Sequence, residues 1–226
     1  MTQTRVLRLF LDSASLEDWQ YWLPTGLFYG VTTNPVLLER AGLRCDHLAL
    51  EQLVQKALSL GAREVQVQSW GRSEEAYIRN GHTIAGYGSG TVVKIPTHEA
   101  GVRAARDLIG QNIRVTMTAV YSPAQALLAS ALGAAYTAPY FGRMNDEGRD
   151  GFREIVAMQE TVRRLGSSTR VLVASLRAAA DVAKLAAAGC DTFTFPAKVA
   201  ADFFGDVAAK AAIETFEMAA EGCKGE

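Results

Sequence analysis

Short apolar runs rich in β-branched residues alternate along this chain with longer stretches in which apolar residues recur at helical spacing. Eight runs have the length and composition of buried strands, and they occupy residues 6–12, 29–34, 64–69, 91–96, 114–120, 134–140, 170–175 and 192–196. Helical patterns cover residues 15–23, 48–60, 100–109, 122–133, 152–166, 178–189 and 207–220. Strand and helix therefore take turns along the chain, without a long linker rich in Pro, Gly or Ser.

This alternation predicts the fold class. Strands that alternate with helices form parallel sheets, and eight repeats favour a closed (β/α)8 TIM barrel over an open doubly wound sheet. The chain has 226 residues and is 49% hydrophobic, which is enough to bury a sizeable core. We therefore expect an α/β protein with a single barrel domain over residues 1–226.

Polar side chains gather at the C-terminal ends of the predicted strands, where a barrel of this kind places its active site. The strand ends carry Asp12, Thr32, Asn34, Gln68, Lys94, Thr116, Thr118, Tyr140 and Ser175. In the run "TVVKIP", side chains alternate between the two faces, so Val92, Lys94 and Pro96 share one face and Val93 and Ile95 the other. We expect Lys94 to point into the barrel beside the other polar groups.

Charge and composition narrow the class of partner. Lys plus Arg number 23 and Asp plus Glu 24, so there is no basic surplus for nucleic acid. The N-terminal stretch lacks the pattern of a secretion signal, and no apolar run has membrane-spanning length. We expect small-molecule partners, no nucleic acid or membrane, and a cytoplasmic location.

Cysteine and histidine spacing argues against a metal site. Cys45, Cys190 and Cys223 lie far apart without a CxxC pair, which is typical of a chain in a reducing compartment. His47, His82 and His98 are scattered, and none has a second ligand at metal-binding spacing. The sequence therefore indicates no structural zinc and no disulfide framework.

A lysine buried in a strand indicates a specific chemistry. Desolvation lowers the pKa of an amine, and a neutral lysine forms Schiff bases with carbonyl substrates, which assists the making and breaking of carbon–carbon bonds. Asp12 and Tyr140 are candidates to move the proton, and Gln68 and Thr118 to orient a water. The alternative is that Lys94 extends from the strand end into solvent without a chemical role.

Five segments together resemble a known family. The stretches "LFLDSAS", "GVTTNP", "VVKIPTHEAG", "TAVYSPAQALLASALGAAYTAPYFGR" and "VLVASLR" are similar to the transaldolase family, most closely its small branch, which contains fructose 6-phosphate aldolase. The resemblance extends from Leu9 to about Phe216. It implies a Schiff-base lysine at Lys94, an acid/base aspartate at Asp12, and no metal or organic cofactor.

The same resemblance implies the remaining contacts. They are substrate hydroxyls at Thr32 and Asn34, a catalytic water at Gln68 and Thr118, and the sugar phosphate at Arg143, Ser175 and Arg177. The phosphate set also has a physical basis, because two guanidinium groups and a hydroxyl follow neighbouring strands and suit a phosphate monoester. Relatives of the small branch assemble as rings of five, often stacked into ten, so we expect a homo-oligomer whose C-terminal helix contacts a neighbour.

Two positions indicate which reaction is favoured. Transaldolases of the family tend to have glutamate at the end of the third strand and phenylalanine at the sixth, whereas the aldolase type has glutamine and tyrosine. Gln68 and Tyr140 match the aldolase type, which cleaves fructose 6-phosphate to dihydroxyacetone and glyceraldehyde 3-phosphate. A tyrosine hydroxyl at this place is suited to helping protonate the enamine.

Three alternatives stay open at this stage. Arg177 is more typical of a transaldolase, which transfers the dihydroxyacetone unit between sugar phosphates. Trp70 and Arg72 follow an unfamiliar third-strand sequence, and Trp70 either packs in the wall or narrows the pocket. A barrel that binds sugar phosphates without turnover is the non-enzymatic alternative, although simple binding does not require Asp12, Thr118 and Tyr140 beside Lys94.

Overall fold

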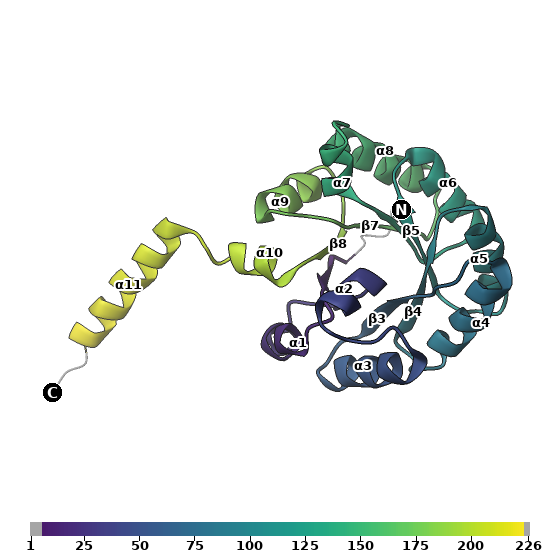
Figure 1. The fold of residues 1–226 in the computed structure, drawn as a ribbon. Coiled ribbons are helices and arrows are strands. Elements are labelled where there is room, and N and C mark those ends of the chain that lie inside the picture. Colours follow the sequence, from purple (N-terminus) through teal and green to yellow (C-terminus); the bar gives the residue numbers. More distant parts are fainter. Residues whose placement is uncertain (1–5, 224–226) are drawn as a thin grey trace.

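The computed structural model describes residues 6–223, in which eight parallel strands close into a barrel in sequence order. The strands are β1 Arg8–Asp12, β2 Gly30–Thr32, β3 Glu64–Gln68, β4 Thr91–Pro96, β5 Val115–Val120, β6 Tyr136–Pro139, β7 Arg170–Val173 and β8 Thr192–Phe195. Every predicted run contains one of them. Figure 1 shows the strands at the centre with the helices around them, which confirms the (β/α)8 barrel.

The helices complete each repeat. They are α1 Leu16–Trp22, α2 Pro35–Arg40, α3 His47–Ser59, α4 Glu74–Ala85, α5 Glu99–Gly110, α6 Pro123–Leu132, α7 Phe141–Asp146, α8 Gly151–Arg164, α9 Ala179–Ala187, α10 Ala197–Asp202 and α11 Val207–Gly222, with the 3₁₀ turn η1 Leu23–Thr25 after α1. Side-chain oxygens of Ser15, Asp46, Ser73 and Asp150 cap α1, α3, α4 and α8 by accepting from backbone N–H groups of the first turn.

One helix of ordinary length, α4, was not among the predicted elements. Its sequence "EEAYIRNGHTIA" holds an interior glycine, Gly81, which by local propensity weakens a helix. In the structure a Cβ on Gly81 would lie 2.6 Å from Leu108 Cδ1 of α5. The glycine therefore lets α4 and α5 pack closely, and this tertiary contact outweighs its low helix propensity.

The two faces of the strands bury different cores. Outward residues such as Val93 and Ile95 pack against the helices, whereas Val92 belongs to a smaller cluster inside the barrel with Phe10, Tyr136, Ala138 and Leu172. Since Lys94 shares the face of Val92, its side chain points into the barrel as predicted. Val92 precedes Lys94 on β4, so this part of the cluster fills the interior on the N-terminal side of Lys94.

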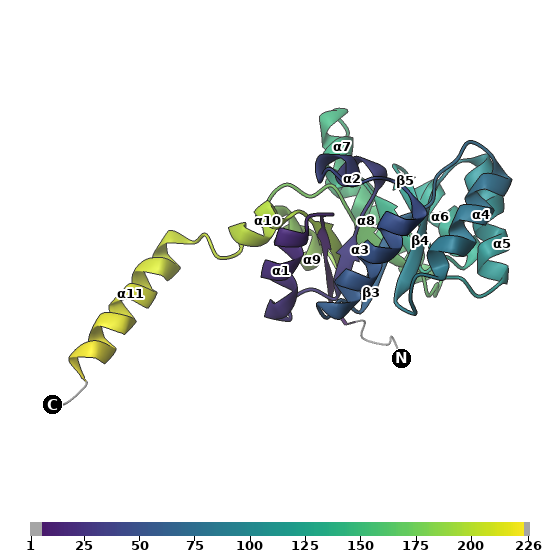
Figure 2. The same ribbon diagram turned by 60° about the horizontal axis from the view of Figure 1, so that its bottom comes forward.

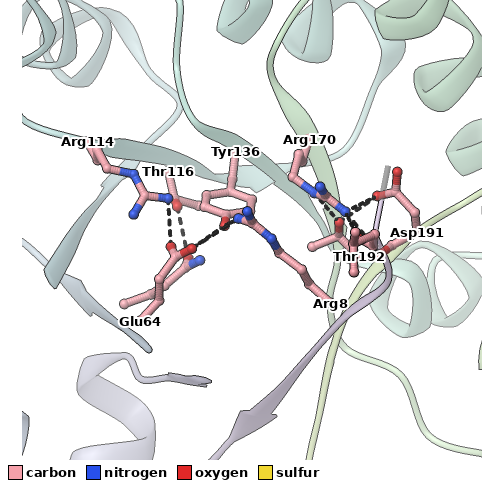
Figure 3. Close-up of polar contacts among 10 residues, drawn as sticks. Arg8, Glu64, Arg114, Thr116, Tyr136, Arg170, Asp191 and Thr192 are labelled. Carbon is pink, nitrogen blue, oxygen red and sulfur yellow. Dashed lines mark hydrogen bonds and ion pairs between the residues drawn. The ribbon is translucent and has the colours of Figure 1, made fainter. Parts of the chain in front are cut away.

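Below that cluster, a network of ion pairs closes the N-terminal end of the barrel (Figure 3). The Glu64 carboxylate, 2% exposed, accepts from Arg8 Nη1 at 3.0 Å and from Arg114 Nη2 at 2.8 Å. The Tyr136 hydroxyl donates to Glu64 Oε1 at 2.8 Å. Beside it, Arg170 Nη2 donates to Asp191 Oδ1 at 3.0 Å. Pairing with an opposite charge offsets the cost of removing each of these charged groups from water.

The C-terminal helix α11 stands apart from the barrel in both ribbon views (Figures 1 and 2). None of its residues is buried, and the exposed side chains include Val207, Ile213, Phe216 and Met218. Within the described part of the chain, no helix has the length and apolar character to cross a membrane. The predictions that concern residues 1–5 and 224–226, including the outer limits of the domain and part of the N-terminal stretch, lie outside the described residues.

Candidate active site

A cavity of about 480 Å³ opens at the C-terminal ends of the strands. This is an ordinary size for a small-molecule site. The candidate residues that line it are Asp12, Asn34, Gln68, Lys94, Thr118, Tyr140, Arg143, Ser175 and Arg177. The barrel thus brings together side chains from seven strands or the segments that follow them. Thr32 is the exception among the candidates, because it is fully buried and does not line the cavity.

Lys94 supplies the buried amine of this cavity. Its side chain is 5% exposed, and Nζ donates to the carbonyl oxygen of Thr33 at 2.8 Å. Thr33 is itself held by β3, since its N–H donates to the Gln66 carbonyl at 2.9 Å. Burial lowers the pKa of the Lys94 amine below its usual range, while the negative charge of Asp12 opposes that shift. The environment therefore shifts the amine towards its neutral form, the one that can act as a nucleophile.

Asp12 is held by a short chain of hydroxyl groups. Thr32 Oγ1 donates to Asp12 Oδ1 at 2.6 Å, and Thr32 Oγ1 also lies 2.6 Å from Thr194 Oγ1. Because the Thr32 proton goes to the carboxylate, the Thr194 hydroxyl donates to Thr32. Thr32, which the resemblance implied as a substrate contact, is therefore placed to orient Asp12. Thr194 was not singled out from the sequence, although its alternate position in "TFTFP" gives it the inward face.

Thr118 and Tyr140 form a second pair across neighbouring strands. Their hydroxyl oxygens lie 2.8 Å apart. Between them the pairing of β5 with β6 slips, and Ala119 has a φ of 56° in the left-handed region. A bulge of this kind redirects the adjacent side chain, and such backbone outliers concentrate at functional sites. The bulge accounts for the approach of Thr118 to Tyr140.

The side-chain amide of Asn34 both caps a helix and lines the cavity. Its Oδ1 accepts from the N–H groups of Val36 and Leu37 at 3.0 and 3.1 Å, and so caps α2. The amide oxygen is thus committed to the helix, which leaves the Nδ2 group as the donor that the cavity can use. Gln68, at the end of β3, lines the cavity from the neighbouring strand.

The three residues expected at the phosphate lie in one sector of the rim. The Arg143 guanidinium lies 4.7 Å from the centroid of the Tyr140 ring. Ser175 has a φ of 61°, and its carbonyl accepts from the Gly142 N–H at 3.0 Å, so the turns after β6 and β7 are tied together. Arg177 pairs with Asp146 of α7.

Several cavity residues were not singled out from the sequence. They are Pro35, Val36, Leu37, Arg40, Ala119, Leu172, Ala174, Leu176, Thr194 and Pro196. Most are apolar, and only the fold shows that they converge. Arg40 is the notable one, because this cation at the end of α2 lines the same cavity as the arginines of the rim. Nothing in its local sequence distinguished it from a surface arginine.

Trp70 and Arg72 lie away from the cavity. The Trp70 ring lies 4.9 Å from the His47 ring, and its carbonyl accepts from Asn80 Nδ2 at 2.8 Å. His47 in turn contacts the Tyr87 hydroxyl through Nδ1 at 2.6 Å. The packing interpretation of Trp70 therefore fits the structure. Among residues 6–223, no three His, Cys, Asp or Glu side chains come together as metal ligands.

Comparison with known proteins gives one family. Residues 9–223 match the family described as transaldolase/fructose-6-phosphate aldolase. A probable transaldolase of Lactiplantibacillus plantarum is 33% identical over 85% of this chain and 87% of its own length. A probable transaldolase of Carboxydothermus hydrogenoformans is 31% identical over 93% and 96% of the two chains.

Similarity to solved structures supports the fold alone. Thiamine phosphate pyrophosphorylase from Pyrococcus furiosus superposes with a TM-score of 0.60 at 14% identity, over 84% of this chain and 85% of that one. A monomeric dihydrodipicolinate synthase variant gives 0.61 at 14% identity, over 95% and 77%. At such low identity, a shared barrel does not establish a shared reaction.

Proposed function

The chain belongs to the transaldolase/fructose-6-phosphate aldolase family, and on that premise we propose that it is a Schiff-base aldolase for fructose 6-phosphate. The family makes it an enzyme of the aldolase/transaldolase type. The observation that carries the more specific proposal is the buried Lys94, whose amine faces a cavity together with Asp12 and Tyr140. The products are dihydroxyacetone and glyceraldehyde 3-phosphate.

The first half of the reaction uses Lys94 and Asp12. Lys94 Nζ adds to the ketone carbon C2 of the open-chain sugar, and loss of water gives a protonated imine. The Asp12 carboxylate takes the proton of the C4 hydroxyl as the C3–C4 bond breaks. The bonding electrons move onto C3 and are delocalised to the imine nitrogen as an enamine, while glyceraldehyde 3-phosphate leaves. Thr32 and Thr194 keep the carboxylate oriented for this step.

The second half decides between an aldolase and a transferase. In an aldolase, the enamine takes a proton at C3, and water then hydrolyses the imine to free dihydroxyacetone and Lys94. The contact of the Tyr140 hydroxyl with Thr118 supports this route, because it offers a proton-carrying pair beside the expected water. In a transaldolase, the enamine instead adds to an aldehyde acceptor. The names of the relatives favour this alternative, since those compared are called probable transaldolases.

Anion recognition and location complete the proposal. We assign the sugar phosphate to Arg143, Ser175 and Arg177, on the chemistry of guanidinium groups with phosphate oxygens. The cysteines Cys45, Cys190 and Cys223 are free thiols, in keeping with the cytoplasmic location that we propose.

One assay separates the two reactions. The protein is incubated with fructose 6-phosphate, with and without erythrose 4-phosphate, and release of glyceraldehyde 3-phosphate is followed over many turnovers. Steady release without the acceptor establishes the aldolase, and release only with the acceptor establishes the transaldolase. The variant Tyr140→Phe should shift the ratio towards transfer, whereas an unchanged ratio would remove the role that we give to Tyr140.

A second assay tests the covalent step. Borohydride added together with substrate should leave a reduced three-carbon unit on Lys94, found by mass spectrometry of the peptide. The control is Lys184→Met, which removes a lysine of α9 that contacts Phe152 instead of the cavity. An unmodified Lys94 peptide would refute the Schiff-base mechanism.

A further inference from the structure

Arg177, one of the two arginines expected at the phosphate, forms an ion pair with a carboxylate outside the cavity. Arg177 Nη1 donates to Asp146 Oδ1 at 2.6 Å, and Nη2 donates to Asp146 Oδ2. The contact is bidentate and uses the terminal edge of the guanidinium, the one formed by its two NH₂ groups. Asp146 itself does not line the cavity, whereas Arg177 does. The carboxylate thus binds the edge of Arg177 that is farther along its own side chain.

Gly142 provides the second point at which α7 holds this arginine. Gly142 and Asp146 are four residues apart, and so lie on the same face of the helix. A Cβ built on Gly142 would lie 2.9 Å from Arg177 Nε and 3.1 Å from Ser175 Oγ. The guanidinium therefore runs along the bare backbone of Gly142. Its Nε end lies in the same small region as the Ser175 hydroxyl.

A guanidinium has two edges that can each bind an oxyanion in bidentate fashion. Asp146 takes the terminal edge of Arg177. Within residues 6–223, Arg177 Nε donates to no protein acceptor, so the side edge stays available next to Ser175 Oγ. Both groups belong to the set that we assign to the sugar phosphate. An arginine that was free to rotate would offer this edge only part of the time.

We propose that Asp146 is a positioning residue for phosphate recognition: it fixes Arg177 along Gly142 so that the Nε edge is presented beside Ser175. The proposal rests on the phosphate assignment made above, and it makes Asp146 a determinant of preference for phosphorylated over unphosphorylated aldehydes. The opposite hypothesis is that Asp146 competes with phosphate for Arg177. The two hypotheses predict changes of opposite sign when the carboxylate is removed.

The charge of Asp146 persists across the range in which such an enzyme is assayed. The hydrogen bond from Arg177 lowers the pKa of the Asp146 carboxyl, and the charge of Arg143 acts in the same direction. Both residues of the pair are exposed, with side-chain exposures of 59% for Arg177 and 52% for Asp146. The pair is therefore worth little for folding, and its removal leaves the barrel intact.

The test compares two aldehydes in the aldol addition of dihydroxyacetone. For Asp146→Asn, we expect the KM for glyceraldehyde 3-phosphate to rise about fivefold, because a charge-assisted contact to phosphate is weakened. The KM for unphosphorylated glyceraldehyde should stay within about twofold, and kcat should be retained with both. The matched control is Glu147→Gln, which removes the same charge from the next residue, outside α7 and away from the cavity.

A double variant and a binding measurement complete the design. In an Arg177→Ala background, Asp146→Asn should have no further effect on the KM ratio, since Asp146 acts through that arginine. Titration with inorganic phosphate by calorimetry should show weaker binding to Asp146→Asn than to the unchanged protein. This readout does not require turnover, so it tests the inference even if the protein cleaves no fructose 6-phosphate.

The overturning results are specific. A lower KM for the phosphorylated aldehyde, or tighter phosphate binding, in Asp146→Asn would establish competition instead of positioning. An equal change with both aldehydes would show that Asp146 does not act on the phosphate. If the unchanged protein turns over neither aldehyde but Asp146→Asn binds phosphate more weakly, the proposed reaction fails and the positioning of Arg177 stands.

Discussion

At the scale of single residues, the burial of Lys94 combines a cost in folding with a benefit in chemistry. The fold places the amine where its charged form is disfavoured, and the carbonyl of Thr33 accepts its hydrogen bond. A neutral amine is the form that attacks a carbonyl group. The same desolvation that would prepare Lys94 for the proposed reaction therefore reduces the stability of the folded barrel.

This cost is measurable by replacing the lysine. Because folding lowers the pKa of Lys94 from its ordinary 10.5, the unfolded chain binds this proton more readily. Between the folded pKa and 10.5, the free energy of unfolding therefore rises with pH. We expect Lys94→Met to abolish borohydride trapping and to raise the free energy of unfolding at neutral pH by about 1–3 kcal/mol. Urea denaturation at neutral and alkaline pH measures the free energy of unfolding of the unchanged protein and of Lys94→Met. A difference between the two that does not shrink at alkaline pH would contradict the explanation.

Asn34 allows folding and binding to be separated. Aspartate caps a helix as well as asparagine does, whereas alanine loses about 1 kcal/mol. Both substitutions remove the Nδ2 donor. We therefore expect Asn34→Asp to keep the thermal midpoint but raise the KM for fructose 6-phosphate, and Asn34→Ala to lower the midpoint as well. Ser73→Ala, which uncaps α4 away from the cavity, is the control that should change stability alone. An unchanged KM in Asn34→Asp would show that the amide serves only the helix.

At the scale of elements, the irregularities of the strands are what shape the site. The bulge in β5 places Ala119, an L-residue, at a φ of 56°. This conformation suits glycine better than alanine. The turns after β6 and β7 show a related compromise, since Gly142 approaches the Ser175 carbonyl so closely that a Cβ there would lie 2.3 Å from it. In both places the backbone adopts a strained or crowded conformation at the edge of the cavity.

The strain at Ala119 gives a prediction for stability. Ala119→Gly should raise the free energy of unfolding by about 0.5–1 kcal/mol, because glycine adopts this φ without penalty. Ala129→Gly, in the middle of α6, is the matched control and should lower it by about 1 kcal/mol. Chemical denaturation measures the two variants together. A loss of stability in Ala119→Gly would mean that packing of the Ala119 methyl group outweighs the strain.

The strands and the rim of the site could be predicted from the sequence, because burial on both faces and polar strand ends leave a strong local pattern. Lys94 and Asp12 belong to that pattern. The contacts that depend on three-dimensional proximity could not be predicted. Asp146 lies outside the elements predicted from the sequence and gains a role only when the fold brings Arg177 beside it. Gly81 lowers the local helix propensity until its packing against α5 is known.

Side-chain roles were also less predictable than positions. The sequence placed Thr32 at the rim and the resemblance implied a substrate contact, but its hydroxyl is taken by Asp12 and Thr194. Asn34 was expected as a ligand group, but half of its amide serves as a cap. Such sharing of hydrogen bonds depends on distances of a few ångströms across the barrel, which no spacing in the sequence encodes.

At the scale of the whole molecule, the two ends of the barrel have separate tasks. The C-terminal end carries the cavity, and the N-terminal end carries the ion pairs of Glu64 with Arg8 and Arg114 (Figure 3). In this fold, the N-terminal end of the barrel usually serves stability and the C-terminal end carries the active site.

That division predicts a variant with a purely structural defect. Glu64→Gln leaves two arginines without their carboxylate, and we expect the free energy of unfolding to fall by about 2–3 kcal/mol. The figure is below that for a fully buried pair because Arg8 and Arg114 are partly exposed, at 25% and 44%. The kcat and KM should be unchanged at a temperature where the variant is folded. A selective loss of kcat would show coupling between the two ends.

The exposed helix α11 predicts self-association. Burial of its exposed apolar side chains against another copy of the chain would lower their free energy, and we propose that this occurs in a homo-oligomer of five or ten subunits. We expect a variant that ends at Gly205, and the point variant Phe216→Glu, to sediment as smaller species than the full chain. Lys210→Glu on the same helix is the control for charge. A full chain that sediments as a monomer would contradict the expectation.

The apolar cluster of Phe10, Val92, Tyr136 and Leu172 has a kinetic consequence under the proposed reaction. Because these buried side chains fill the barrel interior, we expect the cavity to open only at the C-terminal ends of the strands. The aldehyde released by cleavage leaves by the way that any acceptor enters, and both carry a phosphate for the same arginines. The product aldehyde must therefore leave before the acceptor aldehyde binds, so transfer would follow ping-pong kinetics. Accumulating glyceraldehyde 3-phosphate would compete with the acceptor for the same site and slow its binding.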